Sequence, residues 1–512
     1  MELRVLFLAL CLSAVAAADE TNKPKKKIKF LAYSPRMANS HTNFLGKVSD
    51  TLVEAGHEVV MLSPILDHTM SSDGTKKARV ISLPQTANAR YANDVLGATS
   101  NLIWTPQDSK FMFYMMQRWD EMIKGWALTC NDTLHYPGLL EQLRAEDFDV
   151  GYGEALDFCS FALFHVLGIK KFVVMHSMAL IDGHYFLTQA PGVPSYVPTM
   201  TGFSDQMTFL QRLGNAFSTA TVGLTIGGKL NYFHQVFDAF QPGFPSIEEV
   251  AGNASLVFIN SEPLQDFPRV TNHRIIDIRG VIVDGKHGKL NQTWSDIMDL
   301  RPKTVLLSFG SFAKAHLMPE EFKKTIRNTL KKFPDVTFIW KYEKPEHNIS
   351  RGIPNIIEST WVPQVDLLYD SRLSAFITHC GAGSTTEATM AGVPLLVIPL
   401  GADQIWNARV VDRSGAGRVI FDKMLLAEEG PLEENIRELL NDDKYRIAAK
   451  RQAEMLTDRP FKMKDILVRN IEFVAGYGPL RMLDHEGRNL NFFQFYLLDL
   501  VLRVFRIKKK VD

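Results

Sequence analysis

Short apolar runs alternate along the first half of the chain with longer segments of helical pattern. The segment 42–55 has apolar residues at helical spacing and ends at Gly56, which is typical of a helix C-terminus. The predicted strands of this half are 28–34, 58–62, 148–152 and 171–175. Alternation of strands and helices is typical of a parallel sheet covered by helices on both faces.

The same alternation returns in the second half. The predicted strands are 304–308, 336–340, 375–378 and 395–399, and the predicted helices are 319–332, 384–391 and 404–413. Because a Gly-, Lys- and Asn-rich stretch at 283–294 separates the two runs, we predict an α/β protein of two Rossmann-like lobes with parallel sheets. The lobes are expected at 19–285 and 286–460, followed by a helical segment at 461–490.

The N-terminus has the pattern of a cleaved secretory signal at 1–18. Arg4 precedes an apolar run from Val5 to Leu12, and three alanines before Asp19 supply a small-residue cleavage site. The run is shorter than the roughly 18 apolar residues that a membrane span needs. Cleavage would leave three cysteines, an odd number, so at least one thiol is expected to be free. Four sequons would become available for glycosylation: Asn131, Asn253, Asn291 and Asn348.

Residues 491–512 combine apolar and charged positions. One helical face carries the charged residues Asp499, Arg503, Arg506 and Lys510. This pattern is too charged for a membrane span and predicts an amphipathic helix at a membrane surface; the alternative is a last helix packed on the protein body. The chain ends in the form of a dilysine retrieval signal at 509–512, which works only if the tail reaches the cytosol, and the sequence leaves open whether this segment crosses the membrane. With the secretory signal, this ending leads us to expect a membrane-associated protein at the luminal face of the endoplasmic reticulum.

Composition excludes several other classes of protein. The 512 residues carry 57 basic and 57 acidic side chains, and this zero net charge argues against a nucleic acid as the partner. A hydrophobic fraction of 46% is that of a folded globular chain rather than a disordered one. The segment 111–126 is rich in Met and aromatic residues, which either line an adaptable apolar pocket or belong to the core.

The stretch 376–404 carries the most informative chemical pattern. A predicted strand ends at His379, a turn with Gly381 and Gly383 follows, and a helix is expected to start at Ser384. Ligands of open α/β sheets lie beyond the carboxyl ends of strands, where a helix N-terminus offers free N–H groups to a phosphate. Ser384 and Glu387 also have the spacing of a capping box, in which Glu387 would only close the helix.

This stretch resembles the motif of the UDP-glycosyltransferase family, in particular its animal UDP-glucuronosyltransferase branch. Trp-Val-Pro-Gln at 361–364 and Ser-Phe-Gly-Ser at 308–311 look like further elements of that family. Ser40-His41, followed by Ala-Gly-His-Glu-Val at 55–59, is similar to its first strand and helix. The resemblance covers about residues 28–460. It implies a GT-B fold, in which two Rossmann-like lobes face each other.

The resemblance also implies roles in binding a UDP-sugar. Trp361 is expected to stack on the uracil, Gln364 to lie near the base or ribose, and Glu387 to accept hydrogen bonds from the ribose hydroxyls. The residues expected at the diphosphate are Arg269, Ser311, His379, Gly381, Gly383 and Ser384, and those expected at the sugar hydroxyls are Asp403 and Gln404. The alternatives are structural: Trp361 in the core, Arg269 as a surface charge and Asp403 as a helix cap.

His41 is the expected catalytic base, because an acceptor hydroxyl must lose its proton as it attacks the anomeric carbon. Its place at a helix start is expected to keep the ring neutral. In-line attack would invert the anomeric centre. Helix N–H groups and His379 would stabilise the leaving diphosphate, so that neither a metal nor another cofactor is implied beyond the UDP-sugar co-substrate.

The chain departs from the family pattern at three positions. The family usually pairs the catalytic histidine with an aspartate; here Glu154 stands at that place, with Cys159 at the expected spacing, and Asp157 is the alternative partner. Cys380 and Gly383 stand where the animal branch commonly has Gly and Asn. These changes are expected to alter the geometry of the base and the contacts to phosphate or sugar.

The sequence therefore predicts the transfer of glucuronic acid or glucose from a UDP-sugar to a hydroxyl of a small lipophilic acceptor, a conjugation reaction. The changed acidic residue motivates one alternative, a non-catalytic protein that binds a UDP-sugar or a lipophile. The intact His41 favours the enzyme. The expected partners are the UDP-sugar, the acceptor and a membrane surface, and the sequence leaves open whether the protein forms a homo-oligomer.

Overall fold

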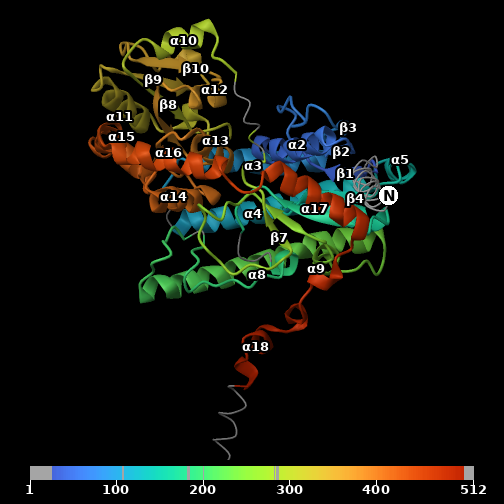
Figure 1. Ribbon diagram of the computed structural model, residues 1–512. Helices are drawn as coiled ribbons and strands as arrows, with labels where there is room; N and C mark the ends of the chain where they lie inside the picture. Colours follow the sequence, from blue (N-terminus) through green and yellow to red (C-terminus); the bar gives the residue numbers. More distant parts are fainter. Residues whose placement is uncertain are drawn as a thin grey trace, which may run out of the picture.

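The computed structural model describes residues 26–500, except 107–108, 181–184, 200, 282 and 284–287. The predictions for the secretory signal and for the cationic end of the chain lie outside these residues. Figure 1 shows two lobes, each built on a sheet flanked by helices. Both sheets are parallel throughout, so the predicted α/β architecture of two Rossmann-like lobes is confirmed.

The sheet of the first lobe has seven strands in the order β3-β2-β1-β4-β5-β6-β7. They are β1 Lys29–Tyr33, β2 Glu58–Pro64, β3 Arg79–Leu83, β4 Val150–Glu154, β5 Phe172–His176, β6 Val257–Ile259 and β7 Ile275–Asp277. All residues of β4 and β5 are buried, as expected for central strands covered on both faces. The strand order reverses between β1 and β4, and the carboxyl ends of strands at such a switch point are where these sheets bind ligands.

The sheet of the second lobe has six strands in the order β10-β9-β8-β11-β12-β13. They are β8 Lys303–Ser308, β9 Val336–Lys341, β10 Ile356–Ser359, β11 Leu373–Thr378, β12 Leu395–Val397 and β13 Gly417–Val419. Here the order reverses between β8 and β11. The segments that follow these two strands are the Ser-Phe-Gly-Ser turn and the turn that begins at His379.

Every strand and helix predicted in the two alternating runs is present, with ends shifted by no more than three residues, whereas the α-helix in the segment expected at 461–490 ends at Tyr477. The sequence pattern missed β3, β6, β7, β10 and β13. Three of these strands, β6, β7 and β13, have only three residues, which is too short for a periodic pattern to appear. β3 lies at an edge of its sheet and has one buried residue among five, so it lacks the apolar run of a central strand.

Two helices of the first lobe are long, α4 with 26 residues and α8 with 32. The helices of this lobe are α2 Asn39–Glu54, α3 Ala87–Leu102, α4 Ser109–Leu134, α5 Leu139–Ala145, α6 Cys159–Val166, α7 Tyr185–Thr188, α8 Phe209–Phe240 and α9 Ile247–Gly252. The Met- and aromatic-rich segment lies in α4, where Met122, Ile123 and Trp126 belong to the core of the lobe. The core interpretation therefore holds for these three side chains.

The second lobe and the end of the chain contain shorter helices. They are α10 Gln292–Met298, α11 Glu320–Lys331, α12 Gln364–Leu368, α13 Ala382–Ala391, α14 Asp403–Ser414, α15 Pro431–Asn441, α16 Asp443–Thr457, α17 Met463–Tyr477 and α18 Phe492–Phe495. In the part of the chain that the structure describes, no helix combines the length and the apolarity that crossing a membrane requires.

α17 returns from the second lobe to the first (Figure 1). Its residues Leu467 and Ile471 are fully buried in a core cluster with Phe30 of β1. Glu472 of this helix lies 3.1 Å from Nε2 of the buried His57. The end of the chain therefore stabilises the first lobe, although it follows the second in sequence.

At the junction of the two lobes, side chains of each lobe pack against the other lobe. Trp104, which follows α3 of the first lobe, is buried in the core of the second lobe and donates a hydrogen bond to the Lys314 carbonyl at 3.2 Å. In the other direction, Trp406 of α14 packs at right angles on Phe267 and donates to Asp266 at 3.1 Å. These contacts hold α14, and the turn before it, against the first lobe.

Candidate active site

His41 and Glu154 meet at the switch point of the first sheet. His41 lies in the first turn of α2, which follows β1, and Glu154 is the last residue of the neighbouring β4. His41 Nδ1 lies 2.7 Å from Glu154 Oε1. The Glu154 side chain is almost fully buried, whereas the His41 side chain keeps 19% of its surface exposed. One nitrogen of the ring is thus held by the carboxylate, and the other, Nε2, remains for a ligand.

The charges of this pair depend on each other. Burial alone would lower the pKa of His41, but the negative charge of Glu154 and its hydrogen bond raise it above its ordinary value. Burial likewise disfavours the Glu154 carboxylate, yet the contact with His41 holds the Glu154 pKa below its ordinary value. Glu154 is therefore the main group that raises the pKa of His41, and the sequence-based expectation that the helix start keeps the ring neutral stays a prediction.

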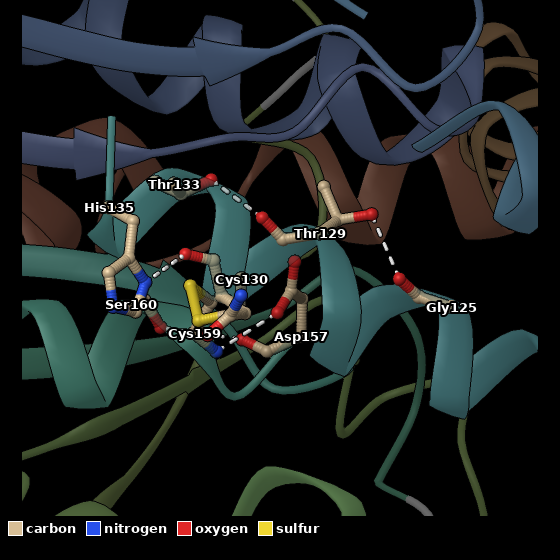
Figure 2. Close-up of a disulfide and its surroundings, with 9 residues drawn as sticks. Gly125, Thr129, Cys130, Thr133, His135, Asp157, Cys159 and Ser160 are labelled. Atoms are coloured by element: carbon tan, nitrogen blue, oxygen red, sulfur yellow. Dashed lines mark hydrogen bonds between the residues drawn. A yellow bond between two sulfur atoms is a disulfide. The ribbon is translucent and has the colours of Figure 1, made fainter. Parts of the chain in front are cut away.

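Asp157, the alternative partner, lies elsewhere. Figure 2 shows it beside the disulfide between Cys130 and Cys159, where its Oδ1 accepts a hydrogen bond from the Cys159 N–H at 2.9 Å. Burial, together with the charge of Glu154, raises the pKa of Asp157 to about 7. The structure thus brings Glu154, and not Asp157, to His41. Among the cysteines that the structure describes, Cys380 is the one outside a disulfide, which agrees with the odd count expected after cleavage.

A residue that sequence reasoning missed completes this group. Ser177 follows β5, and its Oγ lies 2.9 Å from His41 Nδ1 and donates a hydrogen bond to Glu154 Oε1. No motif singles out this serine in the sequence. Its position directly after a central strand next to β4 was the one available signal.

The turn between β11 and α13 differs from its predicted form. α13 begins at Ala382 rather than at Ser384, and Gly381 is its N-cap. Ser384 therefore lies inside the first turn and makes no capping bond, so the capping-box interpretation is wrong. Cys380 adopts φ 67°, the left-handed region that favours glycine. The N–H groups at the start of α13 lie at the carboxyl edge of the second sheet, as a phosphate site requires.

Glu387 is turned towards α12 instead of closing its own helix. Gln364 Nε2 donates hydrogen bonds to Glu387 Oε2 at 2.7 Å and to Ser384 Oγ at 3.0 Å. Burial raises the pKa of Glu387 above its ordinary value, although the Gln364 bond partly compensates. The structure thus brings together three of the residues expected around the ribose and phosphate.

Trp361 and Ser311 lie at the surface. Trp361 exposes 73% of its area, so the alternative of a core residue is wrong. An aromatic ring this exposed is free to stack on a planar ligand. Ser311 is also exposed, in the turn after β8.

His379 is buried between two glycines. A Cβ at Gly310 would lie 2.6 Å from the ring Cε1, and one at Gly381 would lie 2.8 Å from Nε2. These two glycines therefore make room for the histidine ring. A Cβ at Gly383, by contrast, would meet nothing within 4 Å. Burial, with the nearby charge of Lys341, lowers the pKa of His379 to about 4, so the neutral ring has one N–H that it can donate to a ligand.

Asp403 and Gln404 open α14. The Gln404 Oε1 accepts a hydrogen bond from the Leu400 N–H at 2.8 Å, which leaves its amide NH₂ group for a ligand. Asp403 Oδ2 accepts from Asn407 at 3.1 Å, and the Asp403 backbone N–H also donates to this carboxylate, while the N-cap position belongs to Ala402. The charge of Asp403 acts on His41, so these residues of opposite lobes lie close enough to interact.

Arg269 lies at the junction of the lobes. Its Nη1 donates to the Leu180 carbonyl at 3.0 Å, and its guanidinium lies 5.3 Å from the centre of the Trp406 ring. Its charge also lowers the pKa of His176, next to the His41 group. Arg269 is thus partly buried rather than a plain surface charge.

Within the described ranges, no group of three or more His, Cys, Asp or Glu side chains is arranged to hold a metal ion. The candidate site thus has a histidine–carboxylate pair in the first lobe, and a helix N-terminus and an exposed aromatic ring in the second lobe.

Known proteins resemble this chain over nearly its whole length. The family model described as "UDP-glucoronosyl and UDP-glucosyl transferase" matches residues 30–508. The putative UDP-glucuronosyltransferase ugt-47 of Caenorhabditis briggsae is 28% identical over 492 residues, which cover 93% of this chain and 89% of the relative. UDP-glucuronosyltransferase 1A3 of Homo sapiens is 26% identical over 464 residues, which cover 90% of this chain and 85% of that protein.

Solved structures resemble the chain in fold. A UDP-glucosyltransferase from Polygonum tinctorium superposes with a TM-score of 0.59 at 14% identity, covering 89% of this chain and all of that one. The glycosyltransferase SnogD from Streptomyces nogalater superposes with a TM-score of 0.57 at 16% identity, covering 88% of this chain and all of that one. These neighbours are GT-B glycosyltransferases, so the expectation of a GT-B fold is confirmed.

Proposed function

Because this chain belongs to the UDP-glucoronosyl and UDP-glucosyl transferase family, we propose that it transfers glucuronic acid to a hydroxyl of a small lipophilic acceptor, with His41 as the base. Transfer from a UDP-sugar is the activity of the family. The single observation that supports the proposed mechanism best is the 2.7 Å contact between His41 Nδ1 and Glu154 Oε1.

In the proposed reaction, His41 takes the proton of the acceptor hydroxyl. Nδ1 is held by Glu154, so Nε2 is the nitrogen that receives the proton. As the hydroxyl oxygen bonds to the anomeric carbon, the bond from that carbon to the diphosphate oxygen breaks and UDP leaves. The buried Glu154 carboxylate stabilises the imidazolium that forms. Attack from the face opposite UDP inverts the anomeric centre.

The second lobe would hold the donor. We propose that Trp361 stacks on the uracil and that Gln364 and Glu387 bind the ribose. The diphosphate would bind at the start of α13 with the neutral His379, and Asp403 and Gln404 would bind the sugar. The support for this assignment is that Gln364, Ser384 and Glu387 are already joined by hydrogen bonds, and that Asp403 lies within electrostatic reach of His41.

Glucuronic acid is the proposed sugar because curated relatives are named UDP-glucuronosyltransferases. UDP-glucose is the competing donor, since a related fold is found in a UDP-glucosyltransferase. The test supplies each donor in turn to the purified protein with a panel of phenols and steroids, and measures UDP release and product mass. A glucuronide product is the expected result, and a hexoside formed only from UDP-glucose would reassign the donor.

The test of the base compares His41→Ala with His57→Ala. His57 is also a buried histidine paired with a glutamate, but its partner is Glu472 of α17. Turnover is expected to fall about 100-fold or more in His41→Ala, because general base catalysis contributes that much. UDP-sugar binding by calorimetry should remain. His57→Ala should keep its turnover within a fewfold.

Three outcomes would count against these proposals. Equal turnover of His41→Ala and wild type would refute the base. A stereochemical assay that finds retention would refute the in-line attack. If the wild type binds a UDP-sugar but turns over neither donor with any acceptor, the non-catalytic binding protein becomes the better interpretation.

We also propose that the protein contacts a membrane surface through α8. Five large apolar side chains of this helix are more than half exposed: Phe209, Leu210, Leu213, Phe217 and Leu224. At about 100° per residue they fall within one stripe of about 100°. The end of the chain adds exposed residues such as Phe492 and Phe493, and both segments lie on the lower side in Figure 1. An apolar helix stripe without charges is typical of interfacial binding to lipid.

Flotation with phosphatidylcholine vesicles tests this surface. Charged substitutions at Leu213 and Phe217 should reduce co-flotation several-fold without unfolding the protein, because both side chains are exposed. Gln235→Glu, on an exposed polar position of the same helix, is the matched control. Equal flotation of all variants would exclude α8 as the lipid contact, and a dimer that dissociates in the Leu213 variant would point to a second copy instead.

We propose the lumen of the endoplasmic reticulum as the location. The disulfide between Cys130 and Cys159 supports it, because such bonds persist in oxidising compartments. A shift in gel mobility after endoglycosidase treatment is expected, since the chain has four sequons. Recovery of unglycosylated protein with both thiols reduced would contradict this location.

A further inference from the structure

We infer that Ser177 is a positioning residue of the transfer reaction, which fixes the tautomer of His41 and the direction of the Glu154 carboxylate. The inference rests on the proposed role of His41 as the base. Ser177 follows β5, Glu154 ends β4 and His41 lies in α2, so three elements meet at this hydroxyl. Ser177 is 6% exposed, which means that the group is formed inside the protein.

The hydrogen bonds of the group leave one consistent arrangement of protons. The Ser177 hydroxyl has one proton, and it donates that proton to Glu154 Oε1. The 2.9 Å contact between Ser177 Oγ and His41 Nδ1 therefore requires the ring to donate through Nδ1–H. Nδ1–H also faces Glu154 Oε1 at 2.7 Å. The free lone pair is then on Nε2, which is the nitrogen that the proposed reaction needs.

The length of Glu154 explains why a second anchor matters. A glutamate has one more methylene than the aspartate expected from the family pattern, so its carboxylate has more ways to turn away from the ring. Glu154 Oε2 is buried without a hydrogen-bond partner among the described residues. The hydrogen bonds that this carboxylate accepts from His41 and Ser177 both converge on Oε1. Ser177 thus holds the oxygen that faces the histidine.

The backbone of Ser177 is itself held in place. Asn260, which follows β6, donates its side-chain NH₂ group to the Ser177 carbonyl at 2.8 Å. The Asn260 N–H also donates to the His176 carbonyl at 2.8 Å. The end of β5 is thereby fixed to the end of β6, so the Ser177 hydroxyl is presented from a rigid edge of the sheet.

Other charged groups act on the same pair and stay unchanged when Ser177 is replaced. Asp403 of α14 raises the pKa of His41. The charge of His176, at the end of β5, acts on Glu154, and Asp157 is coupled to Glu154. Arg269 acts through His176. A shift of the pH profile in a Ser177 variant can therefore be assigned to the lost hydroxyl.

The experiment measures kcat and both KM values between about pH 5.5 and 9 for wild type, Ser177→Ala, Ser177→Thr and Ser49→Ala. Ser49 is a matched control, because it is fully buried on α2 and bonded to Leu45 and Tyr152 but does not touch the pair. We expect Ser177→Ala to lower kcat about tenfold, the effect of one hydrogen bond to a charged group. Both KM values should stay within about twofold.

The acidic limb of kcat/KM should move to higher pH in Ser177→Ala, by about half a unit to one unit. The reason is that a carboxylate with one donor fewer stabilises the imidazolium more strongly. Ser177→Thr keeps the hydroxyl and should restore the limb, and Ser49→Ala should leave it in place. A Ser177→Ala enzyme with wild-type kcat and limb would overturn the inference. An active His41→Ala enzyme would instead overturn the proposed base, so the two failures are distinguishable.

Discussion

At the scale of the residue, the neighbours of His41 decide its chemistry. Burial disfavours a positive charge on His41, but the Glu154 carboxylate at 2.7 Å favours it more strongly, and the pKa of His41 rises. A base with a raised pKa has to lose its proton before it can act. The rate of transfer is therefore expected to increase as the pH rises through that pKa.

Glu154→Gln tests whether the carboxylate is the group that raises the pKa of His41. The substitution removes the charge that raises the pKa of His41, so burial prevails and the acidic limb of kcat/KM should move below its wild-type position. The plateau should also fall, by about 100-fold, because the imidazolium loses its counter-charge. A pH–rate profile measures both effects. A limb that moves to higher pH would show that another group titrates.

Trp361→Ala is expected to weaken donor binding without loss of stability. A ring that is 73% exposed contributes little to the core, whereas stacking of a base on an aromatic ring is worth about 1–3 kcal/mol. The Kd for UDP should rise about tenfold by calorimetry while the melting temperature stays unchanged. Tyr477→Ala is the control, since that side chain is 72% exposed on α17. An unchanged Kd in the Trp361 variant would remove it from the site.

At the scale of the element, the exact start of a helix changes the use of its side chains. α13 begins two residues before the predicted Ser384, so Glu387 faces Gln364 of α12 instead of its own N-terminus. The start of a second helix, α6, is fixed by the disulfide between its first residue, Cys159, and Cys130 of α4. This bond ties the loop that follows Glu154 to a long helix (Figure 2).

Cys130→Ala and Cys159→Ala should each lower the free energy of unfolding of the first lobe by roughly 3.5 kcal/mol. This is the chain-entropy cost for a bond that closes a loop with a sequence separation of 29 residues. Chemical denaturation measures the loss. The double variant is the control, because both substitutions remove the same bond and their effects should not add. A doubled loss would mean that each cysteine acts through its own packing.

At the scale of the whole molecule, side chains that cross between the lobes hold the site together. Trp104 of the first lobe is buried against Phe309, directly before the turn that carries Ser311. Ile103 accepts a hydrogen bond from Lys423 of the second lobe. α3, which belongs to the lobe of the base, is therefore coupled to a loop expected to bind the donor.

Comparing Trp104→Ala with Trp126→Ala should distinguish a loss of stability from a loss of contact between the two lobes. Loss of a buried tryptophan costs about 3–5 kcal/mol, and at Trp104 it would also loosen the junction. We expect a larger radius of gyration in X-ray scattering and a KM for the UDP-sugar raised several-fold. Trp126→Ala removes a buried tryptophan from the core of the first lobe alone and should destabilise without either effect. Identical scattering and KM for the two variants would disprove the coupling.

Most of the fold follows from the sequence because it depends on local patterns. Apolar runs and helical spacing place the central strands and the helices between them, since these elements are long and buried. The three-residue strands β6, β7 and β13 and the glycine-containing α8 carry no such pattern and appear only in the folded chain. The expected roles of His41, Trp361 and Glu387 also follow from the sequence, because each residue lies in a short motif that resembles the family pattern.

The tertiary structure decides what no single segment contains. Three contacts join residues that are far apart in sequence: His41 with Glu154 rather than Asp157, His41 with Ser177, and Trp104 with Lys314 of the second lobe. Such contacts depend on which strands become neighbours and on the direction of each side chain. Sequence by itself determined the types of residue available to the site, whereas the packing of β1, β4 and β5 determined which of them meet, because distance and burial set their hydrogen bonds and their charge.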